Sequence, residues 1–418
     1  MNTATLPIPG IADPRALQRS LARADRMRKL RAFSLTLPLL LFLMLTFLVP
    51  IAALLKRAVE NAEVANALPR TVVALQRWDR QATPPPDAFA AVTADLGALP
   101  DRADAGALAR RLNSEVAGAR SLVMNTYRAL PLEGAPTPAD VKAKLIALDD
   151  RWSDTKYWHA IAKNASRWTG DYLLASVDLR RDAHGDIERM ASDQRVFSRI
   201  LLRTFEISGI VTLWCLLLGY PLAYWLTTLS PRKANVLMIL VLVPFWTSIL
   251  VRVAAWIVLL QSAGLVNRSL MGLGLIDQPL ALLFNRTGVI IAMVHILLPF
   301  MILPLYSVMK SVPGTYLRAA VSLGSPPLAA FFRVYVPQTY PGIGAGALLV
   351  FILSIGYYVT PALLGGADDQ MLSYYIAQYT NVNVNWGMAC ALGALLLAAT
   401  LVLYAVYRRV VKSELSMG

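Results

Sequence analysis

Residues 318–337 read RAAVSLGSPPLAAFFRVYVP and lie between two apolar segments that are each long enough to cross a membrane. The stretch is too polar to span a bilayer, yet it is more apolar than an ordinary loop. Gly324 can take the positive φ that ends a helix, Ser325 is a natural cap, and a proline suits the first turn of a following helix. We therefore expect two short helices joined by a sharp turn at Gly324, with the second ending at Pro337. Four residues would give the second helix an apolar face: Leu328, Phe331, Phe332 and Tyr335.

The composition is that of a membrane protein. The chain has 418 residues, of which 56% are hydrophobic and 16% charged, and its mean hydropathy is +0.50. A hydrocarbon core of about 30 Å requires about 20 apolar residues in each spanning helix. Six segments meet this length, near 33–55, 200–228, 235–262, 287–309, 341–364 and 386–407. The expected fold class is all-α: a polytopic membrane protein with six transmembrane helices and a helical extracytoplasmic insert between spans 1 and 2.

Basic residues beside the spans predict the orientation, because Lys and Arg near span ends are retained in the cytoplasm. Residues 1–32 form a basic tail before the first transmembrane helix at 33–56, so we expect this tail in the cytoplasm. Six spans return the tail at 411–418 to the same side, and both termini would then be cytoplasmic. The segment 57–199 holds 20 basic and 19 acidic residues, so almost all of the net charge of +14 belongs to the spans and their flanks. The positive charge therefore indicates topology, and we expect no nucleic-acid binding.

The segment 57–199 has helical periodicity and would form a periplasmic helical domain. A helix of about 28 residues is predicted by apolar residues three, four or seven apart, namely Leu108, Leu112, Val116, Val123, Tyr127 and Leu130. A second helix would begin at Thr137 as the N-cap, with Pro138 in its first turn. A third would carry Trp158, Ile161, Ala165 and Trp168. Three roles remain open for this insert: a structural cap over the channel mouth, a docking surface for a partner, or a ligand-sensing pocket.

The opening stretch resembles the EAA loop of ABC-importer permeases. That loop reads Glu-Ala-Ala, three residues, Gly, nine residues, then Ile-x-Leu-Pro, and the same spacing occurs here at Arg318, Ala319, Ala320, Gly324, Val334, Val336 and Pro337. Arg318 reverses the charge of the family's acidic residue. Two further stretches, PFWTSILVRVAAWIVLLQSAGLVN at 244–267 and GYYVTPALLGG at 356–366, are similar to permeases of the spermidine and putrescine type. The resemblance extends over most of a transmembrane permease domain at 200–410, in which 310–340 would be the coupling loop.

The resemblance implies the inner-membrane permease subunit of a bacterial binding-protein-dependent importer. Such a chain works with a second permease subunit, a dimer of ATP-binding cassette subunits, a periplasmic solute-binding protein and the lipid bilayer. It passes a small solute, here a polyamine or related amine, to the cytoplasm by alternating access. The sequence contains no GxxxxGK[ST] phosphate loop, so ATP and Mg would bind to the partner ATPase. This chain would be non-catalytic and would hold no cofactor.

Candidates for the solute path are aromatic residues in or beside the spans, because ring faces attract organic cations. These are Trp246, Trp256, Tyr357, Tyr358 and Tyr375, and interfacial or packing duty explains most of them equally well. Glu206 and Arg252 are ionisable residues in apolar segments, where such groups are costly. For Glu206, structural pairing or snorkelling is the favoured interpretation, with a place in the path as the alternative. His295 has no neighbouring ligand at a suitable spacing, so we expect no metal site.

Two other classes of function are alternatives to the importer. An ion-coupled secondary transporter should contain internal repeats with broken helices and carboxylates at mid-membrane. A membrane receptor with an external helical sensor domain should continue into a soluble cytoplasmic signalling domain. The mid-membrane carboxylates and the signalling domain are both missing from the sequence, and the importer permease is therefore favoured.

Overall fold

The computed structural model describes residues 14–181 and 186–415, and the chain divides into two compact units, residues 1–56 and 57–418. The described part of the first unit is almost entirely helical. It contains α1 (Pro14–Leu43), a π-helical turn (Met44–Leu48) and α2 (Val49–Arg57). Residues Asp25–Arg57 are long and apolar enough to cross a membrane. This stretch includes the first predicted span.

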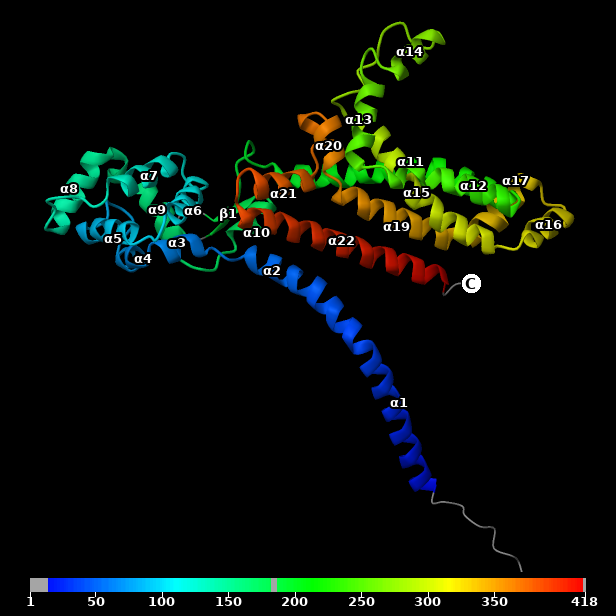
Figure 1. The fold of residues 1–418 in the computed structure, drawn as a ribbon, viewed down its shortest axis with the longest axis horizontal. Helices are drawn as coiled ribbons and strands as arrows, with labels where there is room; N and C mark the ends of the chain where they lie inside the picture. Colours follow the sequence, from blue (N-terminus) through cyan, green and yellow to red (C-terminus); the bar gives the residue numbers. More distant parts are fainter. Residues whose placement is uncertain (1–13, 182–185, 416–418) are drawn as a thin grey trace, which may run out of the picture. The chain divides into compact units, whose positions relative to one another are not determined.

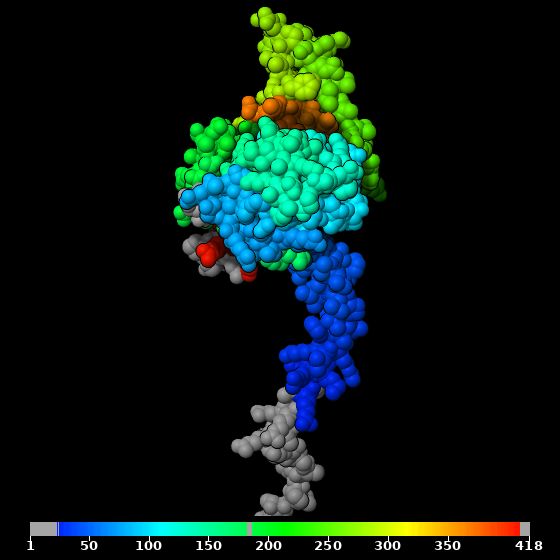
Figure 2. All heavy atoms as spheres, turned by 90° about the vertical axis from the view of Figure 1, so that its left-hand side faces the viewer, coloured from blue at the N-terminus to red at the C-terminus, as the bar shows by residue number. Residues whose placement is uncertain are grey.

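The insert is a helical bundle with its own core (Figure 1). Its helices are α3 (Ala62–Ala67), α4 (Pro69–Leu75), α5 (Pro86–Gly97), α6 (Arg102–Asn113), α7 (Ala119–Ala129), α8 (Pro138–Leu148), a 3-10 turn (Asp150–Ser153), α9 (Thr155–Lys163) and α10 (Asp171–Ser176). A short antiparallel pair follows, β1 (Leu179–Arg181) and β2 (Ile187–Arg189), with Leu179 opposite Arg189. The rings of Phe89 and Trp152 pack on that of Trp158 at centroid distances of 4.6 and 5.1 Å. Figure 2 shows the side chains on one face of the bundle, coloured from blue to teal.

Two predictions about helices in the insert were wrong, and one was confirmed. The predicted helix of about 28 residues is two helices, α6 and α7, because the chain turns at Gly118, which has φ +88°. The amide oxygen of Asn113 fixes this turn by accepting hydrogen bonds from the backbone N–H groups of Gly118 and Arg120. The third predicted helix ends at Lys163, so Ala165 and Trp168 lie beyond it. Thr137 caps α8 as predicted, in a reciprocal capping box with Asp140.

The membrane part is built around α15 (Arg286–Ser311), which is packed between α11 (Phe197–Thr228) and α19 (Tyr340–Gly356). The other elements are α12 (Pro231–Leu242), a 3-10 turn (Val243–Trp246), α13 (Ile249–Leu260), α14 (Leu265–Gly272), α16 (Gly314–Ser322), α17 (Pro327–Ala330), a π-helical turn (Phe331–Tyr335), α18 (Val336–Gln338), α20 (Val359–Leu364), a 3-10 turn (Ala367–Asp369), α21 (Leu372–Asn381) and α22 (Trp386–Leu415). Across the described residues of both units, five helices could span a membrane, and a bent pair would make a sixth. The chain is thus an all-α polytopic membrane protein.

Two predicted spans differ in detail from the observed helices. The segment 235–262 is interrupted at Val243–Trp246, where Pro244 lacks a backbone N–H for continuing α12. The stretch of spanning length is Ile249–Gly272 instead. The segment 341–364 is divided after Gly356, because Tyr357 takes an extended backbone conformation before α20 begins. The corresponding candidate span is the bent pair Pro327–Gln338 and Tyr340–Gly356, whose axes differ by 63°.

Candidate functional site: the helical hairpin and the solute path

The stretch 318–337 lies in a helical hairpin at one end of the membrane part, made by α16 and by α17 with its continuation to Gln338 (Figure 1). Gly324 has φ +91° and stands just after the end of α16. The N–H of Ser325 donates to the carbonyl of Ala320 at 3.1 Å, and the N–H of Gly324 donates to that of Val321 at 3.0 Å. This pair of bonds is a Schellman motif, which closes a helix with a left-handed residue. The predicted turn at Gly324 is confirmed.

Two local predictions about the second hairpin helix were wrong. Ser325 does not cap it, because Pro326 occupies the N-cap and Pro327 the first helical position. Pro337 does not end it, because the helix runs through Gln338 before the chain bends into α19. Pro337 lies in the first turn of α18, where the backbone N–H that a proline lacks is not needed, so the helix continues past it.

The expected apolar face of the second helix is divided between two directions. Phe331 and Tyr335, four residues apart, point toward α11, where the ring of Tyr224 lies 5.0 and 5.3 Å from theirs. Leu328 and Phe332, also four residues apart, lie on another face and are 74% and 63% exposed. The aromatic contacts therefore attach the hairpin to α11 and leave a separate apolar face free.

Exposed apolar side chains from both hairpin helices form what we call the hairpin surface, which consists of Tyr316, Val321, Leu323, Leu328 and Phe332. Arg318 and Arg333 are exposed on the same helices, and neither forms an ion pair with residues 14–181 or 186–415. Ala319 is exposed beside them, whereas Ala320, Val334 and Val336 are half-buried. Apolar side chains gathered on a surface in this way are typical of a site of contact with another protein or with a membrane.

Among the solute-path candidates, Trp256 and Tyr357 belong to one group. The indole N–H of Trp256 donates to Nδ1 of His295 at 3.3 Å. Arg252, one helical turn before Trp256 on α13, interacts electrostatically with both His295 and Tyr357. Its Nε is buried and has no hydrogen-bond partner in the described part of the chain. The group thus combines aromatic rings with one positive charge. The four-residue spacing of Arg252 and Trp256 was the only signal for it in the sequence.

The remaining aromatic candidates lie in other surroundings. Trp246 and Tyr358 are exposed, the first on the 3-10 turn after α12 and the second just before α20. Tyr375 is half-buried on α21, with its ring centroid 6.4 Å from that of Phe197. These three positions offer ring faces at separate places.

Glu206 takes part in an ion-pair network that joins three parts of the fold. Its carboxylate lies 2.8 Å from the guanidinium of Arg286, which also lies 3.3 Å from the carboxylate of Asp369. A neighbouring pair joins Arg203 to Asp368 at 3.6 Å. Glu206 therefore has an ion-pair partner, as the structural interpretation expects, and its place in the solute path stays a prediction. Sequence reasoning missed Arg286, which is 80 positions away from Glu206.

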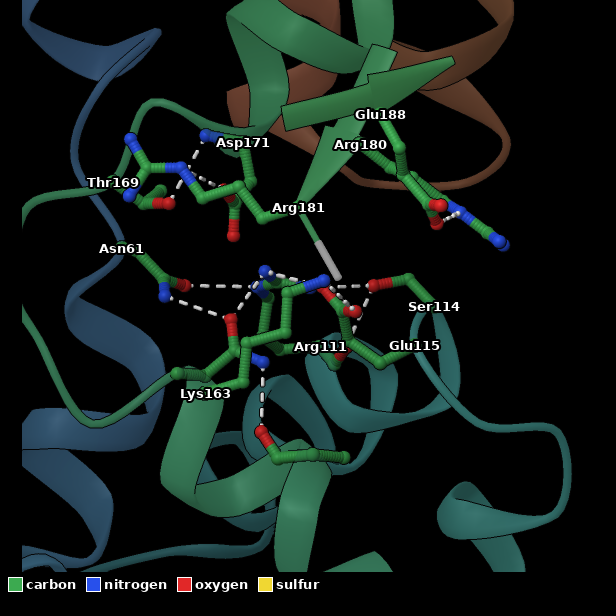
Figure 3. Close-up of polar contacts among 12 residues, drawn as sticks. Asn61, Arg111, Ser114, Glu115, Lys163, Thr169, Asp171, Arg180, Arg181 and Glu188 are labelled. Carbon is green, nitrogen blue, oxygen red and sulfur yellow. Dashed lines mark hydrogen bonds and ion pairs between the residues drawn. The ribbon is translucent and has the colours of Figure 1, made fainter. Parts of the chain in front are cut away.

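We call the region around Asn61 and Asn164, where the chain enters and leaves the insert, the neck. A buried arginine, Arg111, organises it (Figure 3). The guanidinium of Arg111 donates to the side chains of Asn61 at 2.8 Å, Ser114 at 2.8 Å and Glu115 at 3.0 Å, and also to that of Asn164. It lies over the ring of Tyr172, 5.0 Å from the centroid. No motif in the sequence indicated this cluster, because its members are brought together only by the fold.

The neck also connects the insert to the membrane part. The segment that enters the insert is joined to the segment that leaves it by a backbone hydrogen bond: the N–H of Asn61 donates to the carbonyl of Arg167 at 2.7 Å. Tyr172 of α10 then packs against the start of α22, where a Cβ added at Gly387 would lie 2.3 Å from its ring. The absence of a side chain at Gly387 is therefore what permits this close approach. In the described residues, no group of three His, Cys, Asp or Glu side chains could hold a metal ion.

The comparisons with known proteins concern the membrane part. Residues 216–414 match the family described as binding-protein-dependent transport system inner membrane component. The spermidine/putrescine transport system permease protein PotB of Haemophilus influenzae is 37% identical over 209 residues, which cover 50% of this chain and 73% of PotB. PotB of Escherichia coli (strain K12) is 38% identical over 197 residues, which cover 47% of this chain and 71% of PotB. A solved bacterial alginate ABC transporter aligns with 18% identity and a TM-score of 0.42, over 50% of this chain and 76% of that chain.

The fold, the family match and the similarity to the two PotB permeases define a transport permease, a multi-pass protein of the inner membrane. The chain belongs to the family of binding-protein-dependent transport system inner membrane components, and it is an ABC-transporter permease of the polyamine type. The insert lies outside the residues that match the family.

Proposed function

We propose that this chain is one permease subunit of an ATP-driven importer and that it passes a polyamine or related small amine to the cytoplasm. The observation that carries the proposal is the hairpin: a Schellman turn at Gly324 between two short helices that expose an apolar surface. A permease has no ATP site of its own, so it needs such a contact with its ATPase. ATP and Mg bind to that partner, and this chain contributes no catalytic group.

The hairpin is attached in a way that suits a lever. The aromatic contacts of Phe331 and Tyr335 join it to α11, and the 63° bend joins it directly to α19. Both helices pack on α15, so a displacement of the hairpin by closing ATPase subunits would move the centre of the membrane part. Such rigid-body motion of packed helices is a recognised route between two states, here inward-facing and outward-facing. The second permease subunit supplies the other half of the passage.

An amine substrate is supported by the similarity to the two PotB permeases and by the aromatic groups near the path. The rings of Trp256 and Tyr357 can attract an organic cation through their faces. Arg252 opposes that attraction in the same group. A weak net interaction suits passage, since tight retention would prevent release. Selection then rests chiefly with a periplasmic binding protein, which meets the chain on the side of the insert while both termini face the cytoplasm.

The test is reconstitution of the whole transporter in proteoliposomes. We expect uptake of radiolabelled spermidine or putrescine to require ATP on the hairpin side and the binding protein on the insert side. An ATPase variant that binds ATP without hydrolysing it is the control and should abolish uptake. Uptake driven by a proton or sodium gradient without ATP would contradict the importer. Mass spectrometry of the ligand carried by the binding protein tests the substrate separately, and a ligand without an amine would overturn only that part.

A further inference from the structure

A groove lies at the turn between α11 and α12. It is a shallow, open groove of about 480 Å³, lined by Trp225, Leu229, Arg232, Lys233, Val236 and Leu237. Its lining combines apolar side chains from both helices with two cationic side chains, Arg232 and Lys233. The solute path and the hairpin surface use none of these residues.

The charge of the groove is unbalanced. Arg232 and Lys233 are exposed, and neither forms an ion pair with any residue in 14–181 or 186–415. The first turn of α12 contains no acidic residue, and the side chain of Ser230 makes no capping hydrogen bond there. Helix N-termini carry partial positive charge, so two cations at this end raise the local potential further. The groove is therefore complementary to an anion.

The apolar wall identifies what kind of anion fits. Leu229 and Leu237 are half-buried at the groove, while Trp225 is 50% exposed and Val236 is 67% exposed. Exposed apolar residues continue away from the cations along α12, at Ile239 and Leu240. An inorganic anion has no group to place on such a strip, whereas an acyl chain does.

The groove also lies near the level of a membrane surface. Tyr224, the residue before Trp225, packs against Phe331 of the hairpin at 5.0 Å, so the groove and the hairpin share one end of the membrane part. Tryptophan and basic residues at the end of a spanning helix are typical of the level of lipid headgroups. Basic pockets of this kind bind anionic headgroups.

We propose that this groove binds one anionic phospholipid, with its phosphate between Arg232 and Lys233 and the start of an acyl chain along Val236 and Ile239. The lipid would fill the space between α11 and α12 beside the hairpin. Its phosphate would also neutralise the positive N-terminus of α12 and so stabilise the turn between α11 and α12. The residues of α11 that contact the hairpin lie just before this turn.

The experiment is native mass spectrometry of the complete transporter, released from nanodiscs that contain phosphatidylglycerol and phosphatidylcholine in equal amounts. We expect phosphatidylglycerol to be retained in preference, and retention to fall by about fivefold for each cation removed in Arg232→Gln, Lys233→Gln and the double variant. The matched control is Arg408→Gln with Arg409→Gln, an exposed basic pair at the end of α22. This control should retain the lipid.

The competing outcomes are distinct. Equal retention of phosphatidylcholine, or unchanged retention in the double variant, would overturn the site. Equal loss in both basic pairs would show general surface attraction and would also overturn it. Displacement of the lipid by millimolar inorganic phosphate would assign the groove to a small anion. The thermal stability of each variant is measured, and only variants as stable as the unmodified protein are compared. If the double variant does not assemble, the two single substitutions are used in its place.

Discussion

The hydroxyl of Tyr220, on α11, lies 3.0 Å from Oγ1 of Thr339, the fully buried residue at which the hairpin meets α19. Thr339 already donates its hydroxyl proton to the carbonyl of Val336 at 2.7 Å, so Tyr220 is the donor in the bond between them. The bond joins α11 to the chain at its 63° bend. The bond therefore lies at the point where a movement of the hairpin would be transmitted to the helices of the membrane part.

Tyr220→Phe removes this bond and keeps the ring. We expect the free energy of unfolding to fall by about 1 kcal/mol, the net value of an ordinary hydrogen bond, and ATP-driven uptake to fall further than the protein level. The control is Tyr224→Phe, because Tyr224 contacts the hairpin through its ring. Thermal unfolding in detergent and uptake in proteoliposomes measure the two effects. Equal behaviour of the two variants would show that the bond contributes nothing to coupling.

Gly324 is constrained by its backbone conformation alone, because a Cβ built there would meet no atom within 4 Å. Gly324→Val should cost about 1–2 kcal/mol, since a β-branched residue disfavours the left-handed region. We expect the variant permease to insert in normal amount and to lose its ATPase during purification. Gly324→Asn is the control, because Asn tolerates this region. Co-purification of the ATPase with Gly324→Val at the unmodified ratio would show that the hairpin is not the coupling element.

Arg318 makes a complementary test of the same surface. It is exposed and unpaired within residues 14–181 and 186–415. Arg318→Glu restores the residue common in the EAA loop, and we expect stability to change by less than about 0.5 kcal/mol, as for ordinary surface substitutions. Loss of the ATPase from this variant would indicate that the partner presents an acidic group to Arg318.

The sequence predicted the features that depend on local chemistry. The Gly324 turn, the Thr137 cap and most of the apolar spans follow from backbone preference and hydropathy, which act within a few residues. The break between α6 and α7 was missed because apolar spacing continues across Gly118, and periodicity does not record a change of helix axis. The break after Gly356 was missed for a similar reason, since apolar residues continue into α20.

Contacts between distant residues were beyond this kind of reasoning. The pairing of Glu206 with Arg286 depends on how α11 and α15 pack, and nothing in the local sequence specifies it. Arg111 is surrounded by helix-forming residues and reads as a solvated cation. Only the fold brings Asn61 and Asn164 to it, from positions 50 and 53 residues away.

Arg286 should matter more for stability than either of its partners. Arg286→Gln leaves the carboxylate of Asp369, whose side chain is 11% exposed, without its ion pair. Oδ2 of Asp369 still accepts from the backbone N–H of Gly366, but loss of the partner of a buried charge costs about 1–3 kcal/mol. Glu206→Gln is the control, because that side chain is 50% exposed and such pairs contribute about 1 kcal/mol or less. Thermal unfolding in detergent measures the loss of stability in each variant. A larger loss of stability in Glu206→Gln than in Arg286→Gln would contradict the assignment.

The orientation of the chain can be tested by labelling with a membrane-impermeant maleimide. The native thiols, Cys215 and Cys390, are first replaced by Ala. Exposed Asn125 in the insert and exposed Ser322 in the hairpin are then changed to Cys one at a time. We expect Asn125→Cys to react in intact cells and Ser322→Cys to react only in inverted vesicles. The reverse pattern would overturn the topology that basic flanking residues predict.

The neck of the insert should respond to acid through Glu115. Burial acts to raise the pKa of this carboxyl, but Arg111 and Lys163 together outweigh burial and hold the pKa below its usual value. The unfolded chain, with a pKa of about 4.3, then binds a proton before the folded chain does. The stabilisation is complete above the unfolded pKa and is lost as the pH falls through the folded pKa.

Glu115→Gln should therefore destabilise the insert by about 1–3 kcal/mol near pH 7, and by progressively less as the pH falls from 5 toward 3. Fluorescence of the core tryptophans, Trp152 and Trp158, reports unfolding of the insert in the full chain. The control is Glu188→Gln, which breaks an exposed pair with Arg180 and should change stability little at any pH. A difference between the unmodified chain and Glu115→Gln that stays constant from pH 7 to pH 3 would show that the ion pairs of Glu115 do not support the neck.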